Sequence, residues 1–444
     1  MHKRLLDRQS VCLRQLGSGR AGEVRFGRFL ANRRVLVKGL IEGVCAGIGS
    51  RAARRHVLAI QDSSELNFQS HAGRVRGLGT VGNGRDLGFF LHPVLAVDAD
   101  DGACLGLAHL HLWQRHQGKA ANCRDVPIEK KESHRWIEAA QNAGRRLSLS
   151  SRVTVVADRE ADIHELWHRL PDSRTDLLIR ASRDRGLITD SEQKLFAWIA
   201  AQPVRGSYRL MLPAVAGKRS AHEARLQVRF EPVVLKKPRH CPDPQAPESR
   251  ALHIIEVIEG ADTVVGSEAP VHWRLLTTHA VTTLEQARQC IDWYCQRWQI
   301  EQMFRTLKRQ GLNLESSLVG EAGRLEKLAV PAASAAVRTM QLTLARAGKT
   351  ARPATDAFDR KEVEVLRHLQ PTLEGKTGKQ RNPHPLESLA WAAWIIARLG
   401  GWKGYACERK PGPITMLHGL KGFSSIHQGW SIARSENRKD VCIR

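Results

Sequence analysis

Runs of apolar residues alternate with polar stretches through the first part of the chain. Five of these runs predict buried strands, at residues 56–62, 87–98, 104–113, 152–158 and 176–180. An Asp-Ala-Asp-Asp-Gly turn at residues 98–102 separates the second run from the third. Apolar positions at helical spacing predict helices at residues 132–147 and 161–170, on either side of the fourth strand. The pattern therefore predicts three strands, a helix, a strand, a helix and a strand.

After residue 180 the apolar positions follow a period of two. Leu226, Val228 and Phe230 alternate with polar residues, and residues 254–258 form a second run typical of a strand. The segment 236–247 between them has four prolines, which cannot donate to a ladder, so it predicts a mobile surface loop. We interpret residues 186–270, approximately, as an inserted antiparallel β subdomain.

This order of elements resembles that of an RNase H-like domain. The expected fold class is therefore α/β, with an RNase H-like mixed sheet, the β insertion, and helical N- and C-terminal regions. Residues 1–50 are basic and predicted to be helical, and residues 51–350 form the expected catalytic domain. Residues 351–444 are predicted to be helical and rich in tryptophan, with a short basic linker around Lys379. The second half of the catalytic domain holds one further predicted helix.

That helix carries several groups suited to chemistry. Thr282 or Thr283, with a glutamate or glutamine three residues later, predicts its N-cap. On a continuous helix, the offsets from Tyr294 to Arg297, Glu301 and Lys308 place these four side chains on one stripe. A carboxylate flanked by cations suits a metal ion acting on a phosphodiester, whereas the simpler alternative is a charged surface face.

The charge of the chain narrows the class of partner. The 444 residues carry 69 basic and 45 acidic side chains, a formal net charge of +24. A charge of this size favours a polyanionic binding partner. The alternative is that the protein is basic without binding a polyanion. The nine cysteines form no C-x-x-C pair, so they indicate neither a zinc site nor a disulfide framework. We find no signal peptide and no apolar run long enough for a bilayer, which predicts a cytoplasmic protein without a membrane partner.

Three carboxylates fit the plan of a phosphodiester nuclease. Asp62 and Asp158 end the first and fourth predicted strands, and Glu301 lies on the late helix. Such a set can hold two divalent ions, one activating the nucleophile and one stabilising the leaving oxygen. Mg²⁺ is the expected ion because all ligands are hard oxygens, with Mn²⁺ as the alternative. A single strand-end aspartate such as Asp158 can equally cap the helix that follows it.

Several motifs together resemble the insertion-sequence-four family of bacterial transposases, the transposon-five-like enzymes. The spacing Tyr294-x2-Arg297-x3-Glu301-x6-Lys308 is similar to the signature helix of that family. Its two aspartate motifs resemble residues 60–64 and 158–163. Further similarity lies at residues 129–136, 273–278, 389–401 and 411–415, so the resemblance runs from about residue 20 to 430.

The resemblance implies a DDE transposase that excises an insertion sequence by cut and paste. It implies that Asp62, Asp158 and Glu301 bind the metal ions. Residues implied in DNA binding are Tyr294, Arg297, Lys308, Trp273 and Arg180, with Trp273 stacking on a flipped base. The implied partners are double-stranded DNA, as terminal inverted repeats and target, and a second copy of the chain in the DNA complex. The implied location is the bacterial nucleoid.

The sequence departs from the family at its start, where only some 24 residues precede the segment that matches residues 25–35. Two alternatives to an active transposase follow. The first is a truncated or degenerate nuclease that cuts DNA without transposing. The second is a DNA-binding derivative that regulates a full-length enzyme.

Overall fold

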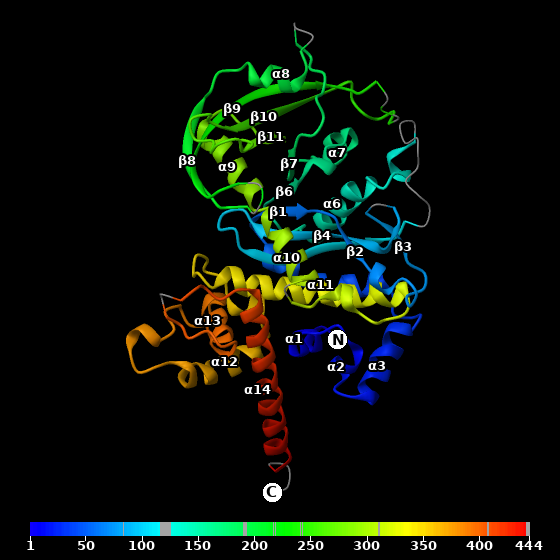
Figure 1. The fold of residues 1–444 in the computed structure, drawn as a ribbon, viewed down its shortest axis with the longest axis vertical. Coiled ribbons are helices and arrows are strands. Elements are labelled where there is room, and N and C mark those ends of the chain that lie inside the picture. Colours follow the sequence, from blue (N-terminus) through cyan, green and yellow to red (C-terminus); the bar gives the residue numbers. More distant parts are fainter. Residues whose placement is uncertain are drawn as a thin grey trace. The chain divides into compact units, whose positions relative to one another are not determined.

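We describe a computed structural model of the chain, shown in Figure 1. It describes residues 1–82, 84–115, 126–189, 193–215, 217, 219–239, 241, 243–309, 311–405 and 408–440, with side chains up to residue 434. The chain forms two compact units. Unit 1 comprises Met1–Ala53, Ser63–Lys119 and Trp298–Arg444, and unit 2 comprises Arg54–Asp62 and Ala120–Arg297.

The centre of unit 2 is a sheet whose strands change direction part-way across. Its strands are β1 (His56–Gln61), β6 (Arg152–Ala157), β7 (Thr175–Arg180), β11 (His272–Thr277), β10 (Ser249–Glu259), β9 (His222–Lys236) and β8 (Gly206–Leu212), in that order. The pairs β1–β6 and β6–β7 are parallel, and every later pair is antiparallel. The first three strands are almost wholly buried, as continuous apolar runs predict.

Helices of unit 2 cover this sheet. They are α6 (His134–Arg146), α7 (His164–Arg169), α8 (Leu195–Ala200) and α9 (Leu284–Cys295), with 3₁₀ turns η2 (Ile128–Lys130) and η3 (Arg159–Ala161). Helix α6 packs on β1, α8 on β9 and β10, and α9 on β6, β7 and β9. The predicted cap of α9 is confirmed: Thr283 and Gln286 form a complete capping box.

The period-two segment forms antiparallel strands, as predicted. Leu226, Val228 and Phe230 are buried along β9. Strand β10 also pairs with β11, which pairs with β7, so these strands continue the core sheet of unit 2 through hydrogen bonds. Glu256 of β10 is 1% exposed and accepts from His272 and Arg274 of β11, which ties β11 to the sheet.

The proline-rich segment lies between β9 and β10, where the described residues 237–239, 241 and 243–248 add no strand. His240 and Pro242 of the predicted loop lie outside the described residues. Asp243 is buried and accepts hydrogen bonds from His168 and Arg169 of α7, so a carboxylate ties this segment to the helix.

The strands of unit 1 pair with one another in antiparallel fashion. Strand β4 (Asp86–Asp98) pairs with β2 (Ser64–Asn67), β3 (Gly79–Val81) and β5 (Cys104–Trp113). The ranges of β4 and β5 confirm the prediction, whereas the two short strands were not predicted. Along the chain the order is β1, β2, β3, β4, β5, α6, β6, α7, β7. The fold is mixed α/β with mostly antiparallel pairing, and it is consistent with an RNase H-like domain.

Helices make up the rest of unit 1. The N-terminal helices are α1 (His2–Arg8), α2 (Leu13–Gly17), α3 (Arg20–Ala31), α4 (Val37–Cys45) and α5 (Ile48–Ala52). The later ones are α10 (Trp298–Lys308), α11 (Ala322–Ala345), α12 (Arg360–Leu373), α13 (Leu389–Leu399) and α14 (Pro413–Asp440), with 3₁₀ turns η1 (Gln69–His71), η4 (Leu314–Ser316), η5 (Ala354–Asp356) and η6 (Gly378–Gln380). In the part of the chain described, no helix combines the length and apolarity that crossing a membrane requires.

Helix α11 is the core of unit 1. It packs on β5, α1, α4, α10, α13 and α14, and most of its length is buried. Alanine is frequent on its buried surface, which lets neighbouring elements approach closely. Figure 1 shows α11 as a long helix beside α10, in the yellow and yellow-green part of the chain.

The prediction of one continuous helix from Tyr294 to Lys308 is wrong. Helix α9 ends at Cys295, residues 296 and 297 form a turn, and α10 begins at Trp298. The backbone N–H of Arg297 bonds to the carbonyl of Tyr294, three residues back, so the chain tightens there and the α-helical pattern stops. Arg297 is therefore a turn residue, and the change from unit 2 to unit 1 falls directly after it.

A buried histidine joins the sheet of unit 2 to the end of α9. The His279 Nε2 atom lies 2.8 Å from the Thr154 hydroxyl, and the ring packs 5.0 Å from that of Trp293. Burial lowers the pKa of His279 to about 4, although Asp176 opposes the shift. The folded state therefore holds this imidazole neutral down to about pH 4.

This histidine should make unit 2 sensitive to acid. Because the folded pKa lies below the unfolded value of 6.5, its contribution to stability is complete above about pH 6.5 and is lost as the pH falls toward 4. The shift corresponds to about 3 kcal/mol. Urea unfolding between pH 4 and 7 should show a flatter profile for His279→Gln, whereas the exposed control His368→Gln should follow the wild type. Equal slopes for H279Q and the wild type would contradict this assignment.

Candidate active site

The register of two parallel strands sets two predicted carboxylates side by side. In the β1–β6 pair Val57 lies opposite Val153 and Ile60 opposite Val156. Asp62 and Asp158 each come two residues after this last pair and directly follow their strands. Neighbouring strands lie about 4.8 Å apart. Two acids therefore follow the strands at the carboxyl edge of this pair, and their role as metal ligands stays a prediction.

Each of these carboxylates already has a partner in the structure. The Arg297 Nη1 atom lies 2.8 Å from the Asp62 Oδ2 atom, and both side chains are less than one-fifth exposed. The backbone N–H of Glu160 donates to the Asp158 Oδ1 atom at 3.0 Å, so Asp158 caps the turn η3. The capping role considered for Asp158 is thus present, and it engages only one of the two oxygens.

An aromatic and cationic group lies at the ends of β7, β11 and α9. The rings of Trp273 and Tyr294 lie 5.7 Å apart at 64°, an edge-to-face contact. Burial raises the pKa of Tyr294, while nearby Arg297 and Arg180 and a hydrogen bond with Arg180 oppose the shift. Burial also lowers the pKa of Arg180, which donates to the His272 carbonyl oxygen at 3.0 Å. The charge of Asp158 also raises the pKa of Tyr294.

Asp162 is fully buried and holds the backbone that follows Arg180. The sequence alone assigns this residue no role. The Asp162 Oδ2 atom accepts the backbone N–H groups of Ser182 and Arg183 at 2.9 and 3.0 Å. Its Oδ1 atom pairs with Arg185, whose side chain is only 5% exposed. Asp162 lies four residues after Asp158, inside the second aspartate motif. This spacing is the only feature of the sequence that points to Asp162. Without knowledge of its burial, Asp162 is indistinguishable from a surface aspartate.

The other signature residues lie in unit 1. Glu301 and Lys308 are both on α10, whose buried face is formed by Ile300, Met303 and Leu307. The Lys308 Nζ atom donates to the Glu65 carbonyl oxygen at 2.8 Å and lies 3.3 Å from the Glu315 Oε1 atom. The same carboxylate oxygen accepts the backbone N–H of Asn67, so Lys308 belongs to a network that joins α10 to β2.

The donor chemistry of the acid pair fits a hard divalent cation. Asp62 and Asp158 offer carboxylate oxygens, the ligands that Mg²⁺ and Mn²⁺ prefer. Within the described ranges, no cluster of three or more histidine, cysteine, aspartate or glutamate residues is arranged to hold a metal ion. Unit 2 thus supplies two of the three predicted ligands, and the predicted three-carboxylate site stays a prediction.

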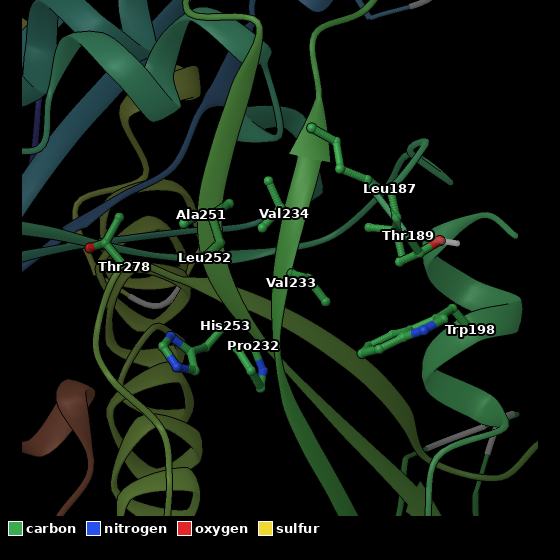
Figure 2. A pocket seen from close by; sticks show the side chains of 11 residues that line it. Leu187, Thr189, Trp198, Pro232, Val233, Val234, Ala251, Leu252, His253 and Thr278 are labelled. Atoms are coloured by element: carbon green, nitrogen blue, oxygen red, sulfur yellow. The ribbon is translucent and has the colours of Figure 1, made fainter. Parts of the chain in front are cut away.

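Unit 2 also has an apolar groove, of about 470 Å³, away from these residues. Its lining includes Trp198, Val233, Leu252 and His253, and Figure 2 shows the Trp198 ring directed from its helix toward the strand that carries Val233. None of the predicted site residues lines it. The groove is therefore distinct from the candidate active site.

Residues 116–326 match the family model described as "Transposase DDE domain". The matched range contains Asp158, Glu301 and all five predicted DNA-binding residues, whereas Asp62 precedes it. The match supports a DDE transposase, hence an enzyme that cuts and joins DNA. A transposase domain implies DNA binding, and such enzymes generally use divalent metals.

Removal of Asp162 should be strongly destabilising. Asp162→Ala would leave Arg185 buried without its partner, and breaking such a pair costs about 3–5 kcal/mol. The matched control is Asp262→Ala, because Asp262 pairs with Arg225 on the surface of the same unit. Chemical unfolding should show a large loss for D162A and little change for D262A. Similar stability of the two variants would contradict the anchoring role.

Proposed function

We infer that this chain is a cut-and-paste DNA transposase of the insertion-sequence-four type. The observation that carries the inference is the position of Asp62 and Asp158 directly after two strands that pair in parallel. The match to the transposase DDE domain supports it, as does the signature spacing from Tyr294 to Lys308.

Three carboxylates have the proposed catalytic role. Asp62, Asp158 and Glu301 would hold divalent ions, with Mg²⁺ as the proposed species and Mn²⁺ as the alternative. Such ions activate the attacking oxygen and stabilise the leaving oxygen during hydrolysis and strand transfer. Glu301 is assigned from the signature spacing alone.

Arg297 has two uses in this proposal. It pairs with Asp62 in the structure, where its charge stabilises the carboxylate. A guanidinium at that place can also make paired hydrogen bonds with a phosphate of the bound DNA. Arg297 can therefore exchange the carboxylate for a phosphate as DNA enters, because the planar carboxylate and the tetrahedral phosphodiester each carry one negative charge on their oxygens.

Arg180, Tyr294 and Lys308 complete the proposed phosphate contacts. The raised pKa keeps Tyr294 a neutral hydroxyl at physiological pH, so it can donate a hydrogen bond to a phosphate oxygen. Arg180 already contacts Tyr294, which orients that hydroxyl. Such contacts position the strand and carry no base sequence.

The remaining parts of the chain have roles that follow from the resemblance. We assign DNA binding to residues 1–50, catalysis to residues 51–350 with the β insertion at about 186–270, and dimerisation to residues 351–444. The proposed partners are the terminal inverted repeats, the target DNA and a second copy of the chain, at the bacterial nucleoid.

Loss of one strand-end carboxylate should abolish cleavage. Asp158→Asn removes a charge that holds the metal ions, and the loss of several kcal/mol of transition-state stabilisation lowers the rate at least about a hundredfold. The assay is Mg²⁺-dependent excision from a plasmid that carries the DNA flanking the gene. D262N, at an exposed aspartate of the same unit, is the control and should keep wild-type activity. Cleavage by D158N at a near wild-type rate would refute the proposed site.

Trp273 should matter most after the first nick. In the proposed reaction the nicked strand closes a hairpin, which forces a base from the stack, and an aromatic ring that receives it returns about 1–3 kcal/mol. Trp273→Ala should therefore slow hairpin formation by about fivefold or more and leave nicking nearly unchanged. A time course of nicked, hairpin and fully cut products measures both steps.

Trp198→Ala is the matched control for this prediction, because Trp198 is a partly exposed tryptophan of the same unit that lines the apolar groove instead. It should leave both steps unchanged. If W273A slows nicking and hairpin formation equally, Trp273 has a packing role only.

A further inference from the structure

Unit 1 has a second groove, of about 790 Å³, which contains none of the predicted site residues. Helix α10 forms one side and the end of α11 another, and residues 400–402 and 408–415, which include the start of α14, close the groove. Trp298, Gln302 and Arg305 of α10 contribute to its lining. Every described residue that lines this groove belongs to unit 1.

The charged side chains of this groove are mainly cations. Arg305, Arg346, Arg409 and Lys410 line it, against a single carboxylate, Glu408. That carboxylate accepts the backbone N–H of Lys403 at 3.1 Å. None of the four cations forms a salt bridge within the described parts of the chain. In unit 2, by contrast, Arg185 and Arg274 pair with the buried carboxylates of Asp162 and Glu256.

Arg346 is the most constrained of these cations. Its Nη1 atom donates to the Pro411 carbonyl oxygen at 2.7 Å, which fixes the guanidinium at the groove wall. Burial lowers the pKa of Arg346, and the neighbouring Arg409 lowers it further. The two guanidinium groups therefore repel each other, and an anion bound at this wall of the groove would relieve their repulsion.

The uncharged groups of the lining also lack acceptors. The Trp402 Nε1 and Gln302 Nε2 atoms are buried and, as far as the chain is described, have no hydrogen-bond partner. A buried donor without an acceptor is unfavourable by about 1–3 kcal/mol. The groove thus presents unsatisfied donors and cations together, which suits a ligand rich in anionic and neutral acceptor oxygens.

An exposed aromatic ring completes the groove. Trp298 is 53% exposed, which is unusual for a tryptophan at the start of a packed helix. Nucleobases stack on such rings whatever their sequence. On α10 the side chains of Trp298, Gln302 and Arg305 follow one face, and Glu301 and Lys308 follow the face beside it. A strand held at Glu301 would have a short path to the groove.

We propose that this groove of unit 1 binds a single strand of DNA, with its phosphates at Arg346, Arg409 and Lys410 and a base on Trp298. The choice of DNA rests on the proposed transposase function. The observations behind it are the exposed ring and, among the residues that the structure describes, four cations without a salt bridge and two donors without an acceptor.

Binding of a labelled single-stranded oligonucleotide, measured in EDTA at several salt concentrations, tests the proposal. Arg409→Gln/Lys410→Gln removes two exposed charges. Each lost phosphate contact on a single strand changes the log–log salt slope by about 0.7, so the slope should become about 1.4 less steep. At 0.1 M salt the affinity should fall about tenfold or more. The control is Arg360→Gln/Lys361→Gln, two exposed charges at the start of α12, which should keep the wild-type slope.

Trp298→Ala gives an independent signature. Stacking involves no counterion release, so W298A should weaken binding about fivefold or more without changing the salt slope. Thermal melting of each variant verifies folding. Slopes equal to that of the control, together with unchanged affinity for W298A, would overturn the proposal. The proposal would also be overturned if the groove variants lost affinity for duplex DNA alone and bound the single strand as the wild type does.

This outcome is separable from the test of the active site. The binding assay contains no metal ion and scores no cleavage. If D158N still cuts DNA, the proposed catalytic site fails whatever the groove variants do. If the groove variants bind as the control does, the groove assignment fails although Mg²⁺-dependent cleavage remains.

Discussion

The pairing of β1 with β6 is the constraint on which the candidate site depends. Because the two strands are parallel, their ends meet at one edge, and Asp62 and Asp158 follow the strands there. Polar and cationic groups surround these two residues. Arg297 contacts Asp62, Asp158 accepts a backbone N–H, and Arg180 lies beside Tyr294. Asp162 then fixes the backbone beyond Arg180, so a buried ion pair supports the position of a more exposed cation.

The parts of the fold that could be predicted from the sequence are those with a strong local signal. Buried parallel strands give continuous apolar runs, and β9, with one buried face, gives alternation. Strands β2 and β3 are too short for either pattern, and the alanine-rich helix α11 shows no stripe because it is buried nearly all round. The end of α9 at Cys295 could not be predicted, because the apolar residues keep a helical spacing on both sides of it. The hydrogen bonds that end this helix have no signature in the sequence. At the site, strand-end acids were found, whereas the role of Asp162 depends on burial.

The net charge of the chain indicates a nucleic-acid partner, but it does not identify the surface that binds the partner. Many arginines of unit 2 neutralise buried acids: Arg274 pairs with Glu256, Arg169 with Asp243 and Arg185 with Asp162. These cations stabilise the sheet and the segments beside it. The groove of unit 1 has the opposite character, since four cations line it against one described carboxylate, Glu408. Arginines that form ion pairs with carboxylates support the fold, and arginines without such a pair are available to phosphates. The total number of basic residues does not distinguish the two groups.

The division of unit 2 into two stretches of chain has a consequence for synthesis. β1 belongs to the short stretch Arg54–Asp62, and its partner β6 lies in the stretch that starts at Ala120. On the ribosome β1 emerges well before β6. At about 5–20 residues per second, this apolar strand waits on the order of 5–20 s for the strand that completes the acid pair. During that interval the nascent chain exposes an unpaired strand edge, a surface that chaperones bind and that aggregation exploits.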